Sequence, residues 1–355
     1  MKQLLYYIPH RFLKSKAGQD IDPVTKEFLS MFNPWISLSD RTGTLNIPGI
    51  EILNNSPIPE QPDFTLSFSA ASYNRIDDCI NMFNAQNRKR LVVFYSGGID
   101  STLIVSLLIS HPGWNSFKHT VWIAVNEDSQ VENPDFFNEI VLPNFGTHLL
   151  PSNGYYDIVT DQNNLCITGE CADNLFGSLT LKSYMDSTGD YDCIHKPWET
   201  TSLNWLLDKR IGYRDEREQM LYDLVNAAPV AIETNHDFLW WLNFAMKWQA
   251  VKYRMAMHAP TAQQAEYIAG NVVNFFDSTL YQQWALYTNE QKVAGTWNSY
   301  KLPAKILIDE IWSNRKYLDY KTKWPSLPTI TRYNNAWGFL YQNDDGSLTA
   351  TKELD

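Results

Sequence analysis

Residues 95–102, YSGGIDST, join the apolar run LVVF at 91–94 to the segment LIVSLLIS at 103–110. The β-branched and aromatic residues of the first run are typical of a buried strand, and the leucines and isoleucines of the second recur at helical spacing. A glycine turn between a strand and a helix N-terminus brings backbone N–H groups together and favours anions. The sequence therefore predicts a strand, a phosphate-binding turn and a helix, which together form the basic unit of an α/β fold.

The residues of the turn exclude two common kinds of phosphate-binding motif. No Gly-Lys-Ser/Thr follows, as a P-loop requires, and Gly97-Gly98 does not supply a dinucleotide G-x-G-x-x-G pattern. The turn also carries Asp100 where a phosphate would sit. A carboxylate beside phosphates is explained if a divalent cation lies between them. The sequence therefore predicts a site for a polyphosphate with Mg²⁺.

Two further apolar runs, 120–125 (TVWIAV) and 165–168 (LCIT), have the character of buried strands. Their spacing suits right-handed crossovers between parallel strands. We therefore expect an α/β fold, with a parallel twisted sheet built around 91–95, 120–125 and 165–168 and helices on both faces. Residues from about 200 to 320 show a helical pattern and are rich in aromatic side chains, which predicts a helical half after the sheet.

Three consecutive parts are expected along the chain. Residues 1–74 contain short strand-like runs such as FTLSFS at 64–69 and predict a small β-rich segment. Residues 75–335 contain the sheet and the helical half. Residues 336–355 predict a hairpin around Asp345-Gly346.

Composition excludes several classes of protein. The chain has 355 residues and a formal net charge of −11, whereas a general nucleic-acid binder is usually basic. No stretch approaches the roughly 20 apolar residues of a membrane span. The four cysteines form no C-x-x-C pair, so neither a zinc site nor a disulfide framework is indicated. We expect a cytoplasmic protein that binds neither membranes nor nucleic acids in general.

Two motifs resemble those of a known family. SGGIDS at 96–101 resembles the S-G-G-x-D-S loop of ATP pyrophosphatases, the PP-loop superfamily with an adenine nucleotide α-hydrolase-like fold. ITGECADNLFGS at 167–178 resembles the S-G-E-G-x-D-E-x-F-G-G segment of asparagine synthetases and β-lactam synthetase-like enzymes. Cys171, Asn174 and Ser178 depart from that pattern, where the family has Gly, Glu and Gly. The first departure predicts a less permissive backbone at the turn.

Two later segments fit the same family in the same order. VVNFFDSTLYQQWA at 272–285 resembles the family's P-F-L-D-x-x-L-V-x-x-A helix start, with Asn274 where proline is usual. DYKTKWPSLP at 319–328 resembles its K-x-x-F element, with Lys321 and Trp324 in the two positions. Lys323 is the alternative for the lysine, because a shift of two residues would exchange the two.

The resemblance implies roles for individual residues. Glu170 and Lys321 would be catalytic, and Asp100 and Asp173 would bind Mg²⁺ over the polyphosphate. The remaining residues would bind ATP: Ser96, Gly97, Gly98, Asp100, Ser101, Thr102, Val125 and Gly169. The chemistry agrees, because acids at the ends of neighbouring strands can share a cation and a lysine can offset charge as pyrophosphate leaves. Alternatives stay open, since Asp173 could be a helix-terminal acid, Glu170 a buried hydrogen-bonding residue and Lys321 a surface lysine.

The implied activity is that of an ATP-dependent, AMP-forming carbon–nitrogen ligase acting on a small-molecule carboxylate, with asparagine from aspartate as the default product. Asparagine synthetases also have an N-terminal glutaminase domain, but position 2 is lysine and the first cysteine is Cys79. Ammonia, a separate glutaminase or a substrate amine would then supply nitrogen. The alternatives are a specialised amide- or lactam-forming or nucleotide- or tRNA-modifying ligase, and an ATP-binding protein without catalysis.

Overall fold

The computed structural model describes residues 2–32, 37–45, 47–60, 63–150, 155–288, 290–322 and 337–354. The chain forms two compact units, and each is described by itself. Unit 1 consists of Met1–Glu60, Asp173–Ala269 and Tyr333–Asp355, and unit 2 consists of Gln61–Ala172 and Gly270–Arg332. Both units therefore combine segments that are distant in sequence, in contrast to the three consecutive parts expected from the sequence.

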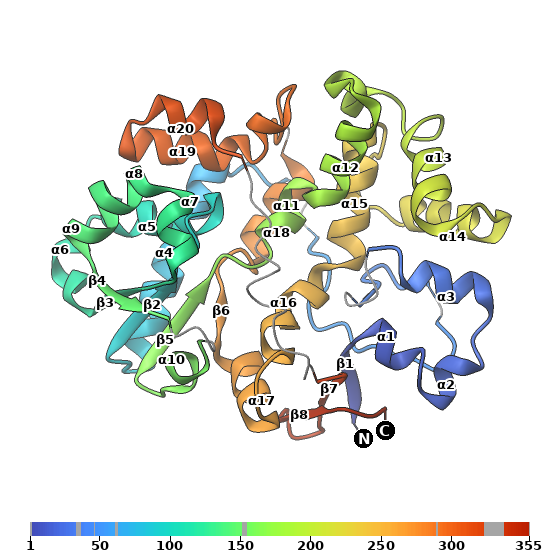
Figure 1. Cartoon of the computed structure of the whole chain (residues 1–355), viewed down its shortest axis with the longest axis horizontal. Coiled ribbons are helices and arrows are strands. Elements are labelled where there is room, and N and C mark those ends of the chain that lie inside the picture. The colour runs from blue at the N-terminus through green and yellow to red at the C-terminus, as the bar shows by residue number, and fades with distance from the viewer. Residues whose placement is uncertain are drawn as a thin grey trace. The chain divides into compact units, whose positions relative to one another are not determined.

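Unit 2 contains a five-stranded parallel sheet (Figure 1). Its strands are β2 (Arg90–Phe94), β3 (Val121–Val125), β4 (Gly146–Leu149), β5 (Asn164–Thr168) and β6 (Val273–Asn274), in the order β4-β3-β2-β5-β6. Leu91, Val92 and Val93 are at most 2% exposed, as expected for a central strand covered on both faces. The prediction of an α/β fold with a parallel sheet around three of these strands is confirmed.

The order of the strands places a change of direction at β2. From β2 the chain continues to β3 and then β4 on one side, and it later returns to β5 on the other side of β2. The register runs from Leu91 opposite Val121 to Phe94 opposite Ala124, and Val93 lies opposite Ile167. In open parallel sheets, ligands bind at the carboxyl ends of the strands where the order reverses. The turn that follows β2 lies at that point.

Helices flank this sheet (Figure 1). Helix α5 packs against β2, α19 packs on α5, and α4 contacts α5, α18 and α19. The α-helices of unit 2 are α4 (Phe68–Ala85), α5 (Ile99–Ser110), α6 (Trp114–Phe117), α7 (Glu127–Glu132), α8 (Pro134–Phe136), α9 (Leu142–Asn144), α10 (Tyr156–Thr160), α18 (Thr279–Tyr287), α19 (Leu302–Trp312) and α20 (Arg315–Tyr320). Shorter turns are η1 (Lys118–Thr120), η2 (Phe137–Val141) and η5 (Trp297–Ser299).

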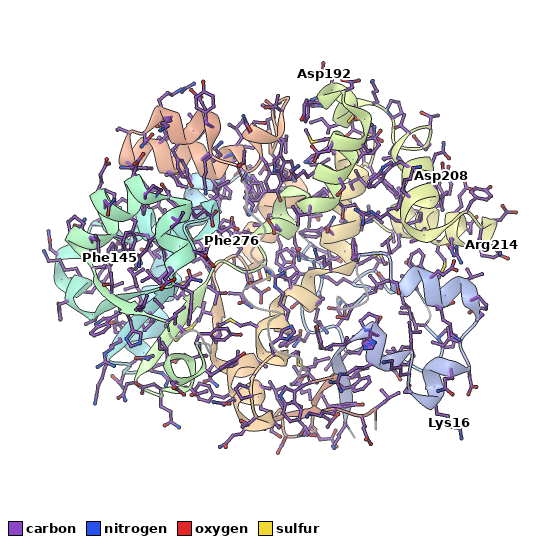
Figure 2. All side chains as sticks on the ribbon, viewed as in Figure 1. Lys16, Phe145, Asp192, Asp208, Arg214 and Phe276 are labelled. Atoms are coloured by element: carbon purple, nitrogen blue, oxygen red, sulfur yellow. The ribbon has the colours of Figure 1, made fainter. Side chains whose placement is uncertain are left out.

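A buried arginine attaches α4 to the segment that follows β6. The guanidinium of Arg75 donates to the carbonyls of Phe275 and Asn274 at 2.8 and 3.2 Å. Asn274 is the last residue of β6, and its carbonyl also accepts from the Asp277 N–H at 3.0 Å, so Arg75 adds a second hydrogen bond where the chain leaves the sheet. Phe276, fully buried, follows directly and lies inside unit 2 (Figure 2).

Unit 1 contains a small antiparallel sheet and most of the remaining helices. Strands β1 (Gln3–Tyr7), β7 (Phe339–Gln342) and β8 (Leu348–Thr351) pair in the order β1-β7-β8. The hairpin predicted around Asp345-Gly346 is confirmed, with Gln342 opposite Leu348. The helices are α1 (Pro9–Phe12), α2 (Lys16–Gln19), α3 (Pro23–Leu29), α12 (Ser178–Thr188), α13 (Ser202–Leu206), α14 (Asp215–Asn226), α15 (Asn235–Met246) and α16 (Trp248–Met257), with the turns η3 (Tyr191–His195) and η4 (Leu207–Ile211). Helices α11 (Ala172–Phe176) and α17 (Ala262–Asn271) each cross a boundary between the units.

The prediction of a β-rich segment over 1–74 is wrong for the part that the structure describes, where β1 is the one strand with a ladder. Three short helices follow β1, and the run expected as a strand at 64–69 contains the start of α4. The hydroxyl of Ser67 accepts a hydrogen bond from the Ala70 N–H and caps that helix. A serine N-cap of this kind favours helix initiation, which outweighed the alternating apolar pattern.

Aromatic side chains fill the helical core of unit 1. Trp241 and Trp248 are fully buried and Trp240 is 3% exposed, so these tryptophans belong to the core. Charged residues of unit 1 such as Lys16, Asp192 and Arg214 are exposed (Figure 2). Among the described helices, none combines the length and apolar character needed to cross a lipid bilayer.

Candidate nucleotide-binding site

The turn after β2 requires glycine at position 97 for two reasons. Gly97 has a φ of +78°, in the left-handed region that side chains disfavour. A Cβ there would lie 2.6 Å from the carbonyl oxygen of Ser129 and 2.8 Å from the Cβ of Glu132. Helix α7 therefore packs directly on the turn, and the backbone has no room for a side chain.

Hydroxyl groups hold the rest of the turn in shape. The Ser101 hydroxyl accepts from the Ser96 N–H at 3.1 Å and donates to the Gly98 carbonyl at 3.2 Å. The Ser96 hydroxyl accepts from the Gly98 N–H at 3.2 Å. Gly98 is the N-cap of α5, and within the described chain no side chain caps this helix. The first-turn amides of a twelve-residue helix, as α5 is, suit an anion such as a phosphate.

The loop after β5 meets this turn. A Cβ on Gly169 would lie 2.9 Å from the Cβ of Asp100 and 3.5 Å from the Ser101 nitrogen, so glycine is needed for the two loops to approach. The Glu170 N–H donates to the Thr168 hydroxyl at 3.3 Å, which itself donates to Asn274 at 2.8 Å. The loops that follow the neighbouring strands β2 and β5 therefore come together.

Asp100 is bound by a lysine that sequence reasoning missed. The ammonium of Lys301 donates to both carboxylate oxygens of Asp100 at 2.5 Å. The Lys301 side chain is 1% exposed, and that of Asp100 is 25% exposed. A lysine buried to this degree is retained when its charge is compensated, and Asp100 supplies that compensation.

Lys321 lies near the same turn and is bound by Glu132 of α7. Its ammonium donates to the Glu132 carboxylate at 2.8 Å and to the Glu132 carbonyl at 3.3 Å. The two side chains are 8% and 12% exposed, so Lys321 is not a solvated surface lysine. Burial raises the pKa of Glu132 and lowers the pKa of Lys321, while the attraction between the two charges opposes both shifts. The charges of Asp100 and Lys301 also act on the pKa of Glu132.

We refer to Asp100, Glu132, Lys301 and Lys321 as the charge cluster. It contains two carboxylates and two ammonium groups, paired across α5, α7, α19 and the end of α20. The cluster therefore has no formal net charge, and it borders the glycine turn at the N-terminus of α5. A bound polyphosphate would give the lysines new partners, and a cation would give the carboxylates one.

Lys305 connects α19 to the backbone of Lys321. It is fully buried and donates to the carbonyls of Asn298 and Lys321, the latter at 3.0 Å. The Lys321 carbonyl is one of those that the end of α20 leaves without a helical partner. Lys301 and Lys305 are four residues apart at the start of α19, so one turn of this helix contacts both Asp100 and Lys321.

Burial lowers the pKa of Lys305 to about 8, and this predicts a pH-dependent stability. The unfolded chain keeps the ordinary lysine value of 10.5, so between about pH 8 and 10.5 it holds a proton that the folded protein has released. This group therefore contributes stability that rises with pH over that interval. We expect the difference in unfolding free energy between wild type and Lys305→Met to change in favour of wild type from pH 7.5 to 9.5. Urea titrations at both pH values measure it, and an unchanged difference would contradict the lowered pKa.

The structure places the other predicted residues as follows. Thr102 is fully buried under the turn, and Val125 is 2% exposed at the end of β3, where its carbonyl accepts from the Leu150 N–H at 2.7 Å. Asp173 lies in the first turn of α11 and begins unit 1, whereas Asp100 belongs to unit 2. A metal shared by these two acids stays a prediction. Lys323 and Trp324 lie outside the described residues.

Cys171 takes the conformation that the family pattern assigns to glycine. It has a φ of +71° and is 1% exposed. A non-glycine residue in the left-handed region costs roughly 1–3 kcal/mol, which the surrounding contacts must offset. The turn at Cys171 therefore carries backbone strain that a glycine at this position would avoid.

The donors at the turn suit a cation that arrives with phosphates. Among the described residues, no group of three or more His, Cys, Asp or Glu side chains is placed to hold a metal ion. Mg²⁺ is usually bound by one or two carboxylates together with substrate phosphates and water. Asp100 fits that pattern as a carboxylate beside the glycine turn.

The sequence matches no protein-family model, and no curated protein matches it.

Lys301, Lys305 and Glu132 had no motif to mark them in the sequence. The nearest signal was Pro303 in the first turn of α19, which predicts a helix start and hence a defined place for the lysines around it.

Proposed function

We propose that the chain is an ATP-dependent carbon–nitrogen ligase that releases AMP and pyrophosphate. One observation carries the proposal: a glycine turn at the N-terminus of α5 has two buried lysines beside it, Lys301 and Lys321, each more than 180 residues away in sequence. Two lysine ammonium groups at a turn that binds anions suit a polyphosphate substrate, because negative charge builds up on the departing pyrophosphate. The resemblance of residues 96–101 and 167–178 to the asparagine synthetase family supports the same reaction.

The reaction has two steps. A carboxylate oxygen of the substrate attacks the α-phosphorus of ATP, and the bond to the bridging oxygen breaks so that pyrophosphate leaves with the bonding electrons. Ammonia or an amine then attacks the acyl carbon of the adenylate, AMP leaves, and the nitrogen loses a proton. Mg²⁺ enters with ATP as part of the substrate and neutralises charge on its phosphates.

The residues of the chain would act by position and charge. The turn at Gly97-Gly98 and the first amides of α5 bind the β- and γ-phosphates, and Asp100 approaches them through the cation. Lys321 offsets charge at the bridging oxygen as the bond breaks, which stabilises the transition state more than the bound substrate. Glu170 would act on the acceptor side, next to Gly169.

Aspartate and ammonia are the first substrates to assay, because the resemblance points to them. A specialised ligase would use another carboxylate or an amine instead, including ring closure within one molecule. The test is ATP-dependent pyrophosphate release by the purified protein with a panel of carboxylates and amines, followed by chromatography of the nucleotide product. AMP is expected. ADP as the coupled product would overturn the proposal, and Mg·ATP binding without turnover on any pair would favour a non-catalytic nucleotide-binding protein.

Asp100→Asn should weaken the binding of ATP in the presence of Mg²⁺ by about tenfold, since one charged ligand to the cation is lost. The same change removes the carboxylate charge that pairs with Lys301 and so removes a negative charge from the turn. ATP binding without Mg²⁺ should therefore be unchanged or tighter. Calorimetric titration with and without the cation separates the two effects. Equal affinity of wild type and variant for Mg·ATP would exclude the metal role of Asp100.

A further inference from the structure

Glu132 is an unexpected residue for an anion site. Its carboxylate oxygen lies 3.5 Å from the position that a Cβ on Gly98 would occupy, and its own Cβ lies 2.8 Å from the position of a Cβ on Gly97. A carboxylate beside a turn that binds phosphates repels them unless its charge is compensated. Compensation comes from Lys321, whose ammonium contacts both the side chain and the backbone carbonyl of Glu132.

These contacts determine where the Lys321 ammonium lies. Lys321 follows the last residue of α20, so the helix itself fixes only its N–H, which donates to the Tyr317 carbonyl at 3.0 Å. Its long side chain has several rotatable bonds, and within unit 2 it is held at α7 by Glu132. The side chains of both residues are nearly buried, so water competes little for either charge.

We propose that Glu132 is a positioning residue that holds the ammonium of Lys321 beside the Gly97-Gly98 turn and limits its attraction to ATP before reaction. This inference rests on the proposed function and extends it to a residue that no motif marks. While Lys321 is paired with Glu132, its attraction to ATP in the ground state is reduced. As the bond to the bridging oxygen breaks, negative charge grows, and the same ammonium can respond to it without first moving.

The proposal predicts opposite changes in affinity and turnover for Glu132→Gln. Glutamine keeps the shape and an acceptor oxygen but removes the carboxylate charge, so less of the Lys321 charge is compensated when phosphates bind. ATP and inorganic pyrophosphate should bind about three- to tenfold tighter, while kcat should fall about tenfold, because a ground state stabilised more than the transition state raises the barrier. A residue needed only for folding would weaken binding and turnover together.

The experiment compares variants by calorimetry and steady-state pyrophosphate release. Glu132→Asp keeps the charge and should restore kcat at least partly, whereas Glu127→Gln, an exposed acid on the same helix, should behave as wild type. In a Lys321→Ala background, Glu132→Gln should cause no further fall in kcat, because its partner is gone. Thermal melting of each variant checks folding.

Three results would overturn the proposal: weaker pyrophosphate binding in Glu132→Gln, an unchanged kcat, or a fall in kcat that persists without Lys321. The binding measurement with inorganic pyrophosphate needs no turnover. If wild type released no pyrophosphate with any substrate, the proposed function would fail, but the binding of pyrophosphate by Glu132→Gln would still decide whether Glu132 restrains Lys321.

Discussion

Lys321→Ala should lower the rate of pyrophosphate release by about 10²–10³-fold, the effect typical of removing one donor that stabilises charge in a transition state. The ammonium of Lys321 lies in the charge cluster, nearly buried, where water does not screen it. Its attraction to the bridging oxygen is greatest when the bond breaks, so the loss should appear in kcat. ATP affinity should fall far less, since the turn and Lys301 remain.

Glu132 determines how this variant must be measured. Without Lys321 its carboxylate has lost a charged partner, and the uncompensated negative charge would repel ATP. Lys321→Ala should therefore be assayed alone and together with Glu132→Gln, which removes that charge. A kcat within threefold of wild type, both in Lys321→Ala and in the double variant with Glu132→Gln, would mean that Lys321 is not the catalytic lysine.

Two lysines provide controls. Lys316→Ala changes an exposed residue of α20 and should leave kcat unchanged. Lys323→Ala tests the alternative alignment of the K-x-x-F element, in which this lysine takes the catalytic role. We expect a mild effect for Lys323→Ala, because Lys321 is the lysine that Glu132 and Lys305 hold in place at the turn. If Lys323→Ala lowered kcat severely and Lys321→Ala stayed near wild type, the catalytic lysine would be Lys323 instead of Lys321.

Gly97→Ala should have the largest effect on stability and should abolish ATP binding. Alanine in the left-handed region and a Cβ pressed against the Ser129 carbonyl together cost roughly 2–5 kcal/mol. The contact atom is backbone, so it cannot rotate away, and relief requires α7 to move from the turn. That movement would also displace Glu132 and hence Lys321.

Substitutions at two other glycines separate the cost of the left-handed backbone from the cost of the close contact with α7. Gly295 has a φ of +76° with nothing within 4 Å of a new Cβ, so Gly295→Ala should cost only the backbone strain of about 1–2 kcal/mol. Gly98 has an ordinary φ and its nearest contact is the Ser96 hydroxyl at 3.1 Å, so Gly98→Ala should cost less. Urea unfolding measures all three. If Gly97→Ala were no more destabilising than Gly295→Ala, the packing of α7 on the turn would not be the constraint we describe.

The sequence by itself determined the central part of unit 2. Strands 91–95, 120–125 and 165–168 are continuous apolar runs, and such runs identify strands buried on both faces whatever their neighbours. The glycine turn and the helix that follows could also be predicted from short stretches of sequence, because φ preferences and helix-start signals act over a few residues. The terminal hairpin was predictable for the same reason, from Asp345-Gly346.

Only the tertiary structure decided which charged residues lie at the turn. Lys301 and Lys321 reach Asp100 and Glu132 from about 200 residues away, and a lysine has the same local preferences whether it ends in solvent or beside a carboxylate. Likewise, β1 found its partner β7 at the other end of the chain, which no local pattern specifies. Burial and pairing depend on how α5, α7 and α19 pack, so the lysines of the site could be identified only once those helices had been placed.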